Sequence, residues 1–170
     1  MKMKKIYTFI LAALFITVGF SSCNDSWEDP DGFSSAMWYA STTINATTKI
    51  YTADINTGII FWDISKQCLA HTWTVSDGVK FLKGNPDVQE GTDLAPYVDE
   101  SMSSTTSDKM VTLFFPTIGD YTVTIHDEFA EPVTYKSELG DIDAVLDEAT
   151  GRYIIDYTYT IRVTIPVEEE

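Results

Sequence analysis

The chain is poor in cysteine, histidine and positive charge. Its 170 residues include 2 cysteines, 2 histidines and 11 lysines and arginines, against 26 aspartates and glutamates, for a formal net charge of −15. Nucleic-acid binding depends on Lys and Arg at the phosphates, so this balance argues against a nucleic-acid partner. It also argues against an electrostatic patch that would hold the protein on a membrane.

Motifs for catalysis and for transition metals are missing as well. The two histidines, His71 and His126, form no His-x₃-His or His-Glu-x-x-His spacing, and no Cys-x-x-Cys occurs, so the sequence predicts no transition-metal site. No Gly-x-Ser-x-Gly elbow or phosphate-binding glycine loop is found. In so acidic a chain, two nearby carboxylates are no evidence of a glycosidase. We therefore expect no catalytic residue and no enzyme.

Calcium is the metal whose oxygen ligands are abundant, in the acidic stretch 140–151 that contains Asp141, Asp143, Asp147 and Glu148. This stretch lacks the regular oxygen spacing and central glycine of an EF-hand loop. A solvated acidic loop is favoured over a calcium site, so we expect no cofactor. The apolar residues within the stretch leave open a short hairpin or a helical turn in place of coil.

The N-terminal segment has no apolar run long enough for a membrane span. Three lysines precede residues 6–20, which carry no charge, and two serines and Cys23 follow. The order basic, apolar, small is that of a secretory signal, whereas a transmembrane helix needs about 20 apolar residues. Residues 1–22 are the predicted signal peptide, and their removal would deepen the negative charge by three.

The stretch FSSC, Phe20–Cys23, resembles the lipobox of bacterial lipoproteins, with Phe20 where an aliphatic residue is commoner. The resemblance implies a diacylglyceryl group on the Cys23 thiol and cleavage that leaves Cys23 as the N-terminus. Two or more acyl chains anchor a protein stably. The alternative is a disulfide between Cys23 and Cys68 in an oxidising compartment. If Cys23 is acylated, Cys68 is an odd thiol, more often a small buried hydrophobe than a reactive group.

The acids that follow the cysteine, Asp25, Glu28, Asp29 and Asp31, resemble the export tag of Bacteroidota-type surface lipoproteins. The resemblance implies an outer-membrane, lipid-anchored protein exposed at the cell surface. A disordered, solvated tether is the other interpretation, and both can hold. We assign residues 23–42 to the lipidated cysteine and this tether, and residues 43–170 to a single domain.

Alternation with a period of two dominates the rest of the chain. From Tyr153 to Ile165 the odd positions are Tyr, Ile and Val while most even positions are polar, which is typical of a half-buried antiparallel strand. Further strands are expected at Thr48–Ala53, Ile59–Ile64, Leu69–Val75, Val79–Leu82, Lys109–Phe115, Asp120–His126 and Pro132–Lys136. Eight short strands with little helix predict an all-β antiparallel sandwich. The polar stretch Lys83–Asp108 is expected to be a long loop, either functional or disordered.

Two stretches resemble the signatures of the PKD (polycystic kidney disease) domain, an immunoglobulin-like sandwich. They are WTVSDG at Trp73–Gly78 and FPTIGDYTVTI at Phe115–Ile125. The resemblance covers roughly residues 43–127. Val75, Ser76 and Phe115 depart from the usual Phe, Gly and Tyr, and a long insertion separates the two signatures.

The PKD resemblance implies structural roles for the signature residues. Trp73 is expected to fill the centre between two sheets, and Asp77-Gly78 to form a tight hairpin with positive φ. Gly119 is expected in a turn, and Tyr121 resembles a corner tyrosine that ties a loop to the backbone.

Sugar binding would require exposed aromatic rings beside polar groups. Outside the signatures the candidates are Trp27, Trp38, Tyr39 and Trp62. Trp62 lies in an apolar strand, so we expect it in the core. Trp38 and Tyr39 are the candidate glycan-stacking residues, of which one is expected to face water, with packing onto the sheet edge as the alternative.

In surface lipoproteins with PKD-like modules, the implied setting is polysaccharide uptake together with outer-membrane transport proteins. We therefore expect a non-enzymatic surface lipoprotein whose module binds glycan or acts as a spacer. A structural or adhesive protein-binding module, or the remnant of a longer multidomain surface lipoprotein, are the alternatives.

Overall fold

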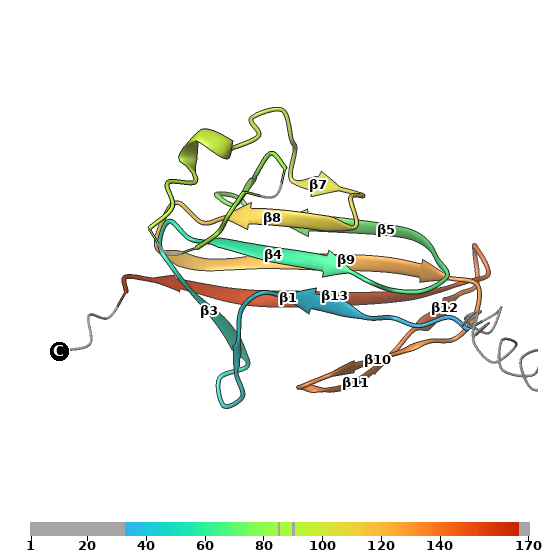
Figure 1. Ribbon diagram of the computed structural model, residues 1–170. Coiled ribbons are helices and arrows are strands. Elements are labelled where there is room, and N and C mark those ends of the chain that lie inside the picture. The colour runs from blue at the N-terminus through green and yellow to red at the C-terminus, as the bar shows by residue number, and fades with distance from the viewer. Residues whose placement is uncertain (1–32, 85, 90, 167–170) are drawn as a thin grey trace, which may run out of the picture. The chain divides into compact units, whose positions relative to one another are not determined.

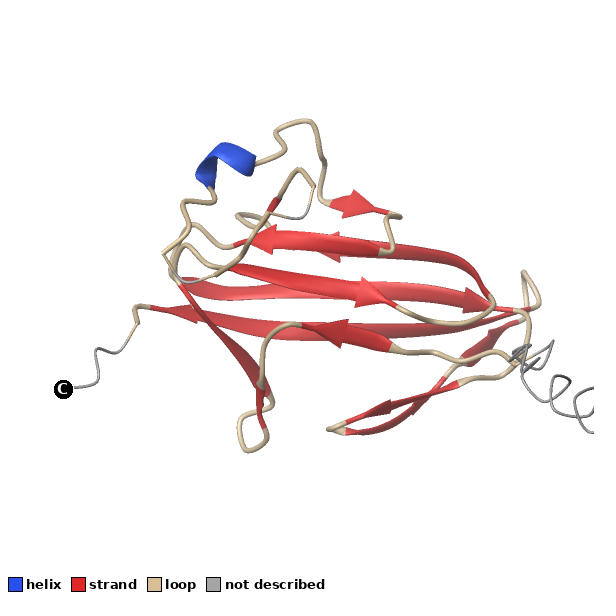
Figure 2. Cartoon of the chain, viewed as in Figure 1, coloured by secondary structure: helices blue, strands red, loops and turns tan. Residues whose placement is uncertain are grey.

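The computed structural model describes residues 33–84, 86–89 and 91–166. Cys23, Trp27, the predicted signal peptide and the first part of the predicted tether lie outside them. The described part is all-β, with mostly antiparallel sheets packed together, consistent with a sandwich (Figures 1 and 2). Its one helical element is a 3₁₀ turn, η1, at Ala95–Tyr97. Within these ranges no helix has the length and apolar character to cross a membrane.

The smaller sheet has four antiparallel strands in the order β1-β4-β8-β6. Their bounds are Trp38–Ala40, Gly58–Asp63, Met110–Phe114 and Lys80–Phe81. In β4 the buried positions Ile59, Phe61 and Asp63 alternate with outward ones. Trp62 therefore lies on the outer face, where it is 46% exposed. The prediction that Trp62 belongs to the core is wrong, because the alternation set by Ile59 and Phe61 turns it toward solvent. Since β1 is part of this sheet, the sandwich includes residues before Thr43.

The larger sheet is built on two long central strands, β9 and β13. Its order is β2-β3-β13-β9-β5-β7, with β12 also paired to β13. β3 runs parallel to β13 while the other neighbours are antiparallel. The bounds are Ile44–Asn45 (β2), Ile50–Asp54 (β3), Cys68–Val75 (β5), Thr105–Thr106 (β7), Gly119–Phe129 (β9), Val145–Asp147 (β12) and Arg152–Thr164 (β13).

The alternation predicted for Tyr153–Ile165 is confirmed in β13. Its odd positions from Ile155 to Val163 are buried, while Asp156, Thr158 and Arg162 are exposed. β9 pairs with β13 in antiparallel register from Gly119 opposite Val163 to Phe129 opposite Tyr153. A long paired ribbon with one apolar face needs a second layer to cover that face. The smaller sheet provides it.

Aromatic side chains join the two sheets. Phe61 of the smaller sheet lies 5.1 Å from Tyr159 and 5.7 Å from Trp73 of the larger sheet, measured between ring centroids. All three side chains are almost completely buried. The prediction that Trp73 fills the space between two sheets is confirmed.

The acidic stretch 140–151 contains two short strands followed by a turn at 148–151. A separate two-stranded sheet pairs β10, Thr134–Ser137, with β11, Gly140–Asp143. The acids there have partners of their own: Asp141 accepts from Lys136 Nζ at 2.5 Å, and Asp143 from Thr134 Oγ1 at 2.6 Å. Asp147 accepts from Thr150 Oγ1 at 2.6 Å. Short strands are thus observed in place of coil or a helical turn, and each belongs to a hairpin whose other strand, β10 or β13, lies outside the stretch.

The Asp77-Gly78 turn leads from one sheet into the other. The Val79 N–H donates to the Ser76 carbonyl at 3.3 Å, and Gly78 has φ of +91°. The tight turn with positive φ is confirmed, but β5 and β6 belong to different sheets, so the turn is not a hairpin. Gly78 also lies over Tyr121, since a Cβ at that position would stand 3.2 Å from the tyrosine ring.

The Tyr121 side chain hydrogen-bonds to the turn that precedes β9. Its hydroxyl donates to the Thr117 carbonyl at 3.0 Å and lies 2.6 Å from Thr117 Oγ1. This is the loop-to-backbone bond expected of a corner tyrosine. Gly119, at the start of β9, packs against the same ring. A Cβ added at Gly119 would lie 3.5 Å from it.

The stretch Lys83–Asp108 packs onto the smaller sheet with a core of its own. Leu82, Leu94 and Phe114 are buried together, with Val88 and Val98 against them. This small cluster lies beside the last residue of β8, Phe114, and the first residue of β4, Gly58. The described part of the stretch, residues 83–84, 86–89 and 91–108, thus has apolar contacts that its polar composition did not predict.

Gly58 has no side chain, which lets the stretch Lys83–Asp108 approach β4 closely. We therefore expect Gly58→Ala to displace this stretch. A Cβ at Gly58 would lie 2.7 Å from Val88 Cγ1 and 3.0 Å from Leu94 Cδ1. Overpacking of this kind costs about 1–3 kcal/mol, measurable as a lower urea midpoint of unfolding. The double variant with Val88→Ala should recover part of the loss; strictly additive effects of the two substitutions would contradict the contact.

Candidate functional site

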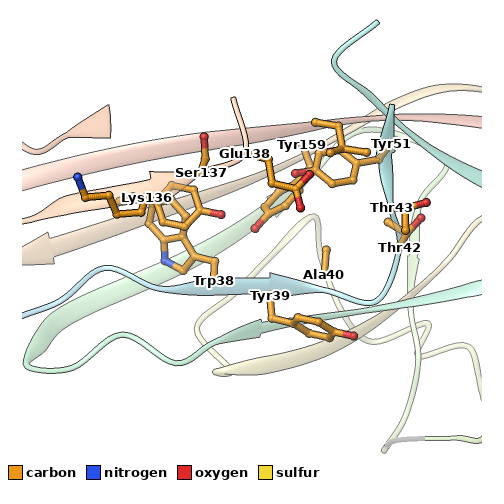
Figure 3. A pocket seen from close by; sticks show the side chains of 12 residues that line it. Trp38, Tyr39, Ala40, Thr42, Thr43, Tyr51, Lys136, Ser137, Glu138 and Tyr159 are labelled. Atoms are coloured by element: carbon orange, nitrogen blue, oxygen red, sulfur yellow. The ribbon is translucent and has the colours of Figure 1, made fainter. Parts of the chain in front are cut away.

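A cavity of about 490 Å³ opens beside β1, and five aromatic residues line it, Tyr39 and four others. Trp38 comes from β1, Tyr51 from β3, Tyr135 from β10 and Tyr159 from β13. Figure 3 shows Trp38, Tyr51 and Tyr159 on the same side of β1. The cavity therefore forms where the edge of the smaller sheet meets the larger sheet and the β10–β11 hairpin.

Contacts among the aromatic rings hold the cavity wall in place. The ring centroids of Trp38 and Tyr135 are 4.2 Å apart, and those of Tyr51 and Tyr159 are 5.1 Å apart. The hydroxyls of Tyr51 and Tyr157 lie 3.2 Å from each other. Burial raises the pKa of Tyr51 and of Tyr159 above the ordinary tyrosine range. These hydroxyls are therefore neutral at physiological pH and can donate or accept hydrogen bonds.

The rim of the cavity is polar. Thr42, Thr43, Ser137, Lys136 and Glu138 line it. Lys136 is paired with Asp141, and Glu138 is the one carboxylate among the described lining residues. A glycosidase needs two carboxyl groups on either side of the bond it cleaves, and the described lining residues supply one.

Trp38 is buried and anchors β1 to the larger sheet. Its side chain is only 6% exposed, and its indole N–H donates to Asp127 Oδ2 at 2.7 Å. Ser65 Oγ donates to the same carboxylate oxygen at 3.1 Å. The Ser65 backbone N–H in turn donates to Asp63 Oδ1 at 2.8 Å. We call Trp38, Ser65, Asp63 and Asp127 the buried polar network.

Asp127 is the central acceptor of the buried polar network. It is completely buried. Burial, followed by the nearby carboxylate of Asp63, raises the pKa of Asp127 to about 6, although the hydrogen bonds from Trp38 and Ser65 and the proximity of His71 act in the opposite direction. Burial of a carboxylate costs free energy, which the hydrogen bonds from its donors offset.

Tyr39 lies on the opposite side of β1 from Trp38 (Figure 3). It is 53% exposed and pairs directly with Trp62 of β4, which is 46% exposed. Trp62 pairs in turn with Met110 of β8, which is 38% exposed. We call Tyr39, Trp62 and Met110 the outer row. The expectation that one member of the Trp38-Tyr39 pair faces water is met by Tyr39.

Sequence reasoning missed Trp62 as a surface residue. The alternation of Ile59, Phe61 and Asp63 indicated an outward Trp62. It was overlooked because an acidic residue, Asp63, is not expected at a buried position. The predicted glycan-stacking residues are split: Tyr39 offers its ring to solvent, whereas Trp38 has little exposed surface left. The role of both in glycan binding stays a prediction, and the lipidation prediction for Cys23 lies outside the described residues. Trp73, Asp77, Gly78, Gly119 and Tyr121 do not line the aromatic cavity.

No family model matches the chain, and no curated protein matches it significantly. The PKD resemblance therefore stays a prediction.

Proposed function

We propose that this protein is a non-enzymatic lipoprotein, anchored at the cell surface, whose PKD-like, immunoglobulin-like sandwich binds glycan or acts as a spacer in a polysaccharide-uptake system. The all-β sandwich architecture supports the module, and the lipobox-like stretch supports the anchor. Outer-membrane uptake proteins are the partners that such a setting implies.

The outer row is the observation that carries the glycan proposal. Sugar rings have apolar faces that stack on exposed aromatic side chains. Directly paired residues on neighbouring strands have Cβ atoms about 4.5–5.5 Å apart, so Tyr39 and Trp62 are side-by-side neighbours on the outer face. The strands fix the backbone of both residues, so little conformational entropy is lost when a ligand binds.

Attachment to the membrane rests on Cys23. The formal net charge of −15 disfavours electrostatic attachment to an anionic bilayer, so a covalent lipid is the means of attachment that fits this charge. Acyl chains on Cys23 would hold the protein at the outer membrane and leave the sandwich free to meet soluble polysaccharide.

Affinity gel electrophoresis of the full chain in detergent, against a panel of polysaccharides, tests glycan binding. We expect at least one polysaccharide to retard the protein. Tyr39→Ala and Trp62→Ala should each weaken that binding by about tenfold or more, as truncation of a central aromatic contact does in other interfaces. Tyr97→Ala is the matched control, because Tyr97 is also an exposed aromatic residue, 44% exposed, but lies outside the outer row.

Absence of retardation by every polysaccharide would contradict the glycan proposal. The structural or adhesive alternative would then lead, since an exposed apolar row also suits a protein partner. Crosslinking at the cell surface would recover that partner, and its recovery should depend on Trp62. Equal binding by wild type, Tyr39→Ala and Trp62→Ala would place any sugar contact elsewhere.

A further inference from the structure

Three metal-ligating side chains converge at one end of the sandwich. Asp63 ends β4 of the smaller sheet, while Cys68 and His71 lie on β5 of the larger sheet. One ligand atom from each lies within 4.8 Å of the other two. His71 Nδ1 and Asp63 Oδ2 are 3.7 Å apart. The three groups thus face one another across the two layers.

A β-bulge brings Cys68 to this face. Residues three apart in a regular strand point to opposite sides, so Cys68 and His71 would be separated by the sheet. The pairing of β5 with β9 instead shifts between Cys68, opposite Phe129, and Ala70, opposite Glu128. The extra residue, Leu69, reverses the alternation and turns Cys68 toward the side of His71. Bulges that re-aim a side chain in this way are common beside functional sites.

The polar atoms around this point lack partners. Asp63 Oδ2, His71 Nε2 and Asp127 Oδ1 are buried and have no hydrogen-bond partner among the described residues. The side chain of Asp63 is 0% exposed and that of His71 is 11% exposed. Their 3.7 Å separation exceeds hydrogen-bond length. Because buried polar groups are nearly always satisfied, a cation bound between these side chains would give Asp63 Oδ2 the partner that it lacks.

We propose that Asp63, Cys68 and His71 form a binding site for a zinc-class divalent cation, which would link the two sheets. A thiolate, an imidazole and one carboxylate are the ligands that Zn²⁺ prefers, whereas Ca²⁺ and Mg²⁺ take oxygen ligands. Ligand atoms on a tetrahedral zinc stand about 3.3–3.8 Å apart, given metal–ligand bonds of 2.0–2.3 Å. The distance from His71 Nδ1 to Asp63 Oδ2, 3.7 Å, already lies in this range, and the other separations are at most 4.8 Å.

Binding exchanges one proton for the metal. The Cys68 thiol donates to the Ala70 carbonyl at 3.0 Å. When the sulfur–metal bond forms, this S–H bond breaks and the proton leaves to solvent. The thiolate and the Asp63 carboxylate balance the two positive charges of the ion, and neutral His71 supplies a lone pair. Asp127, held by Trp38 and Ser65, is an outer carboxylate that favours the cation electrostatically. The site does not depend on the proposed glycan role.

Cobalt and zinc titrations of the full chain, first treated with a chelator, test this site. We expect one Co²⁺ to bind with a near-ultraviolet band from thiolate-to-cobalt charge transfer, and Zn²⁺ to displace it. Cys68→Ser should abolish the band. His71→Gln should weaken Zn²⁺ binding by at least about tenfold, the smallest loss seen even for residues that support a ligand. His126→Gln removes the chain's other histidine, which is partly exposed, and should leave affinity unchanged.

A wild-type spectrum without the charge-transfer band would overturn the proposal, and so would a band that survives Cys68→Ser, because the thiol would then be Cys23. Thermal melts of each variant in chelator show whether it folds. If Cys68→Ser or His71→Gln does not fold, the wild-type cobalt spectrum and a zinc-dependent rise in its melting temperature decide alone. A rise with Ca²⁺ but not Zn²⁺ would also contradict the assignment.

Discussion

Trp73→Ala should lower the free energy of unfolding by about 3–5 kcal/mol, the largest loss that we expect from one substitution in this protein. The Trp73 side chain is completely buried. Its ring lies 5.7 Å from that of Phe61 in the facing sheet and 6.4 Å from that of Tyr159 in its own sheet. Truncation removes one of the aromatic contacts between the two layers and leaves a cavity at their centre. Urea denaturation monitored by far-ultraviolet circular dichroism measures the loss.

Trp62→Ala is the matched control, because it makes the same chemical change on the outer face, where the side chain is 46% exposed. We expect a loss of at most about 1 kcal/mol there. Trp73→Phe should cost less than Trp73→Ala, since the ring volume is partly kept and the Trp73 Nε1 has no described hydrogen-bond partner to lose. Equal midpoints for Trp73→Ala and Trp62→Ala would contradict the assignment of Trp73 to the centre of the core.

The two long central strands were predictable because each buries a single face. Alternation of large apolar and polar residues located β9 and β13 to within a few residues, and the core positions of Tyr157 and Tyr159 followed from the same pattern. Short strands such as β1 and β7 were missed, because two or three residues cannot show a period. Such strands form only when a longer neighbour offers a free edge, which is a tertiary effect.

Other features depend on contacts between the sheets and could not be predicted from one stretch at a time. The turn at Gly78 has the chemistry of a hairpin, yet its strands pair with different neighbours. Alternation along β5 places Cys68 and His71 on opposite faces, and only the bulge at Leu69 unites them. The prediction of no transition-metal site rested on sequence spacing alone, and spacing cannot show that Asp63 comes within 4.8 Å of these two side chains.

The buried polar network carries the second large effect that we predict. Trp38→Phe keeps an aromatic ring against Tyr135 and Tyr157 but removes the indole N–H that donates to Asp127 Oδ2 at 2.7 Å. Ser65 is then the remaining donor to that oxygen. Hydrogen bonds to charged groups contribute about 1.5–3 kcal/mol, and we expect Trp38→Phe to lower the free energy of unfolding by about 2–3 kcal/mol. Trp62→Phe, on the exposed face, should change it by less than about 0.5 kcal/mol.

A double-mutant cycle separates the hydrogen bond from ring packing. In an Asp127→Asn background the acceptor is neutral, so the cost of Trp38→Phe should fall to about 1 kcal/mol, the contribution of an ordinary hydrogen bond. Chelator in all samples keeps bound metal from adding to stability. If Trp38→Phe costs the same with Asp127 as with Asn, ring packing alone holds β1. A coupling of about 1–2 kcal/mol would instead show that the buried Asp127 carboxylate fixes Trp38, and with it the strand that presents Tyr39 on the outer face.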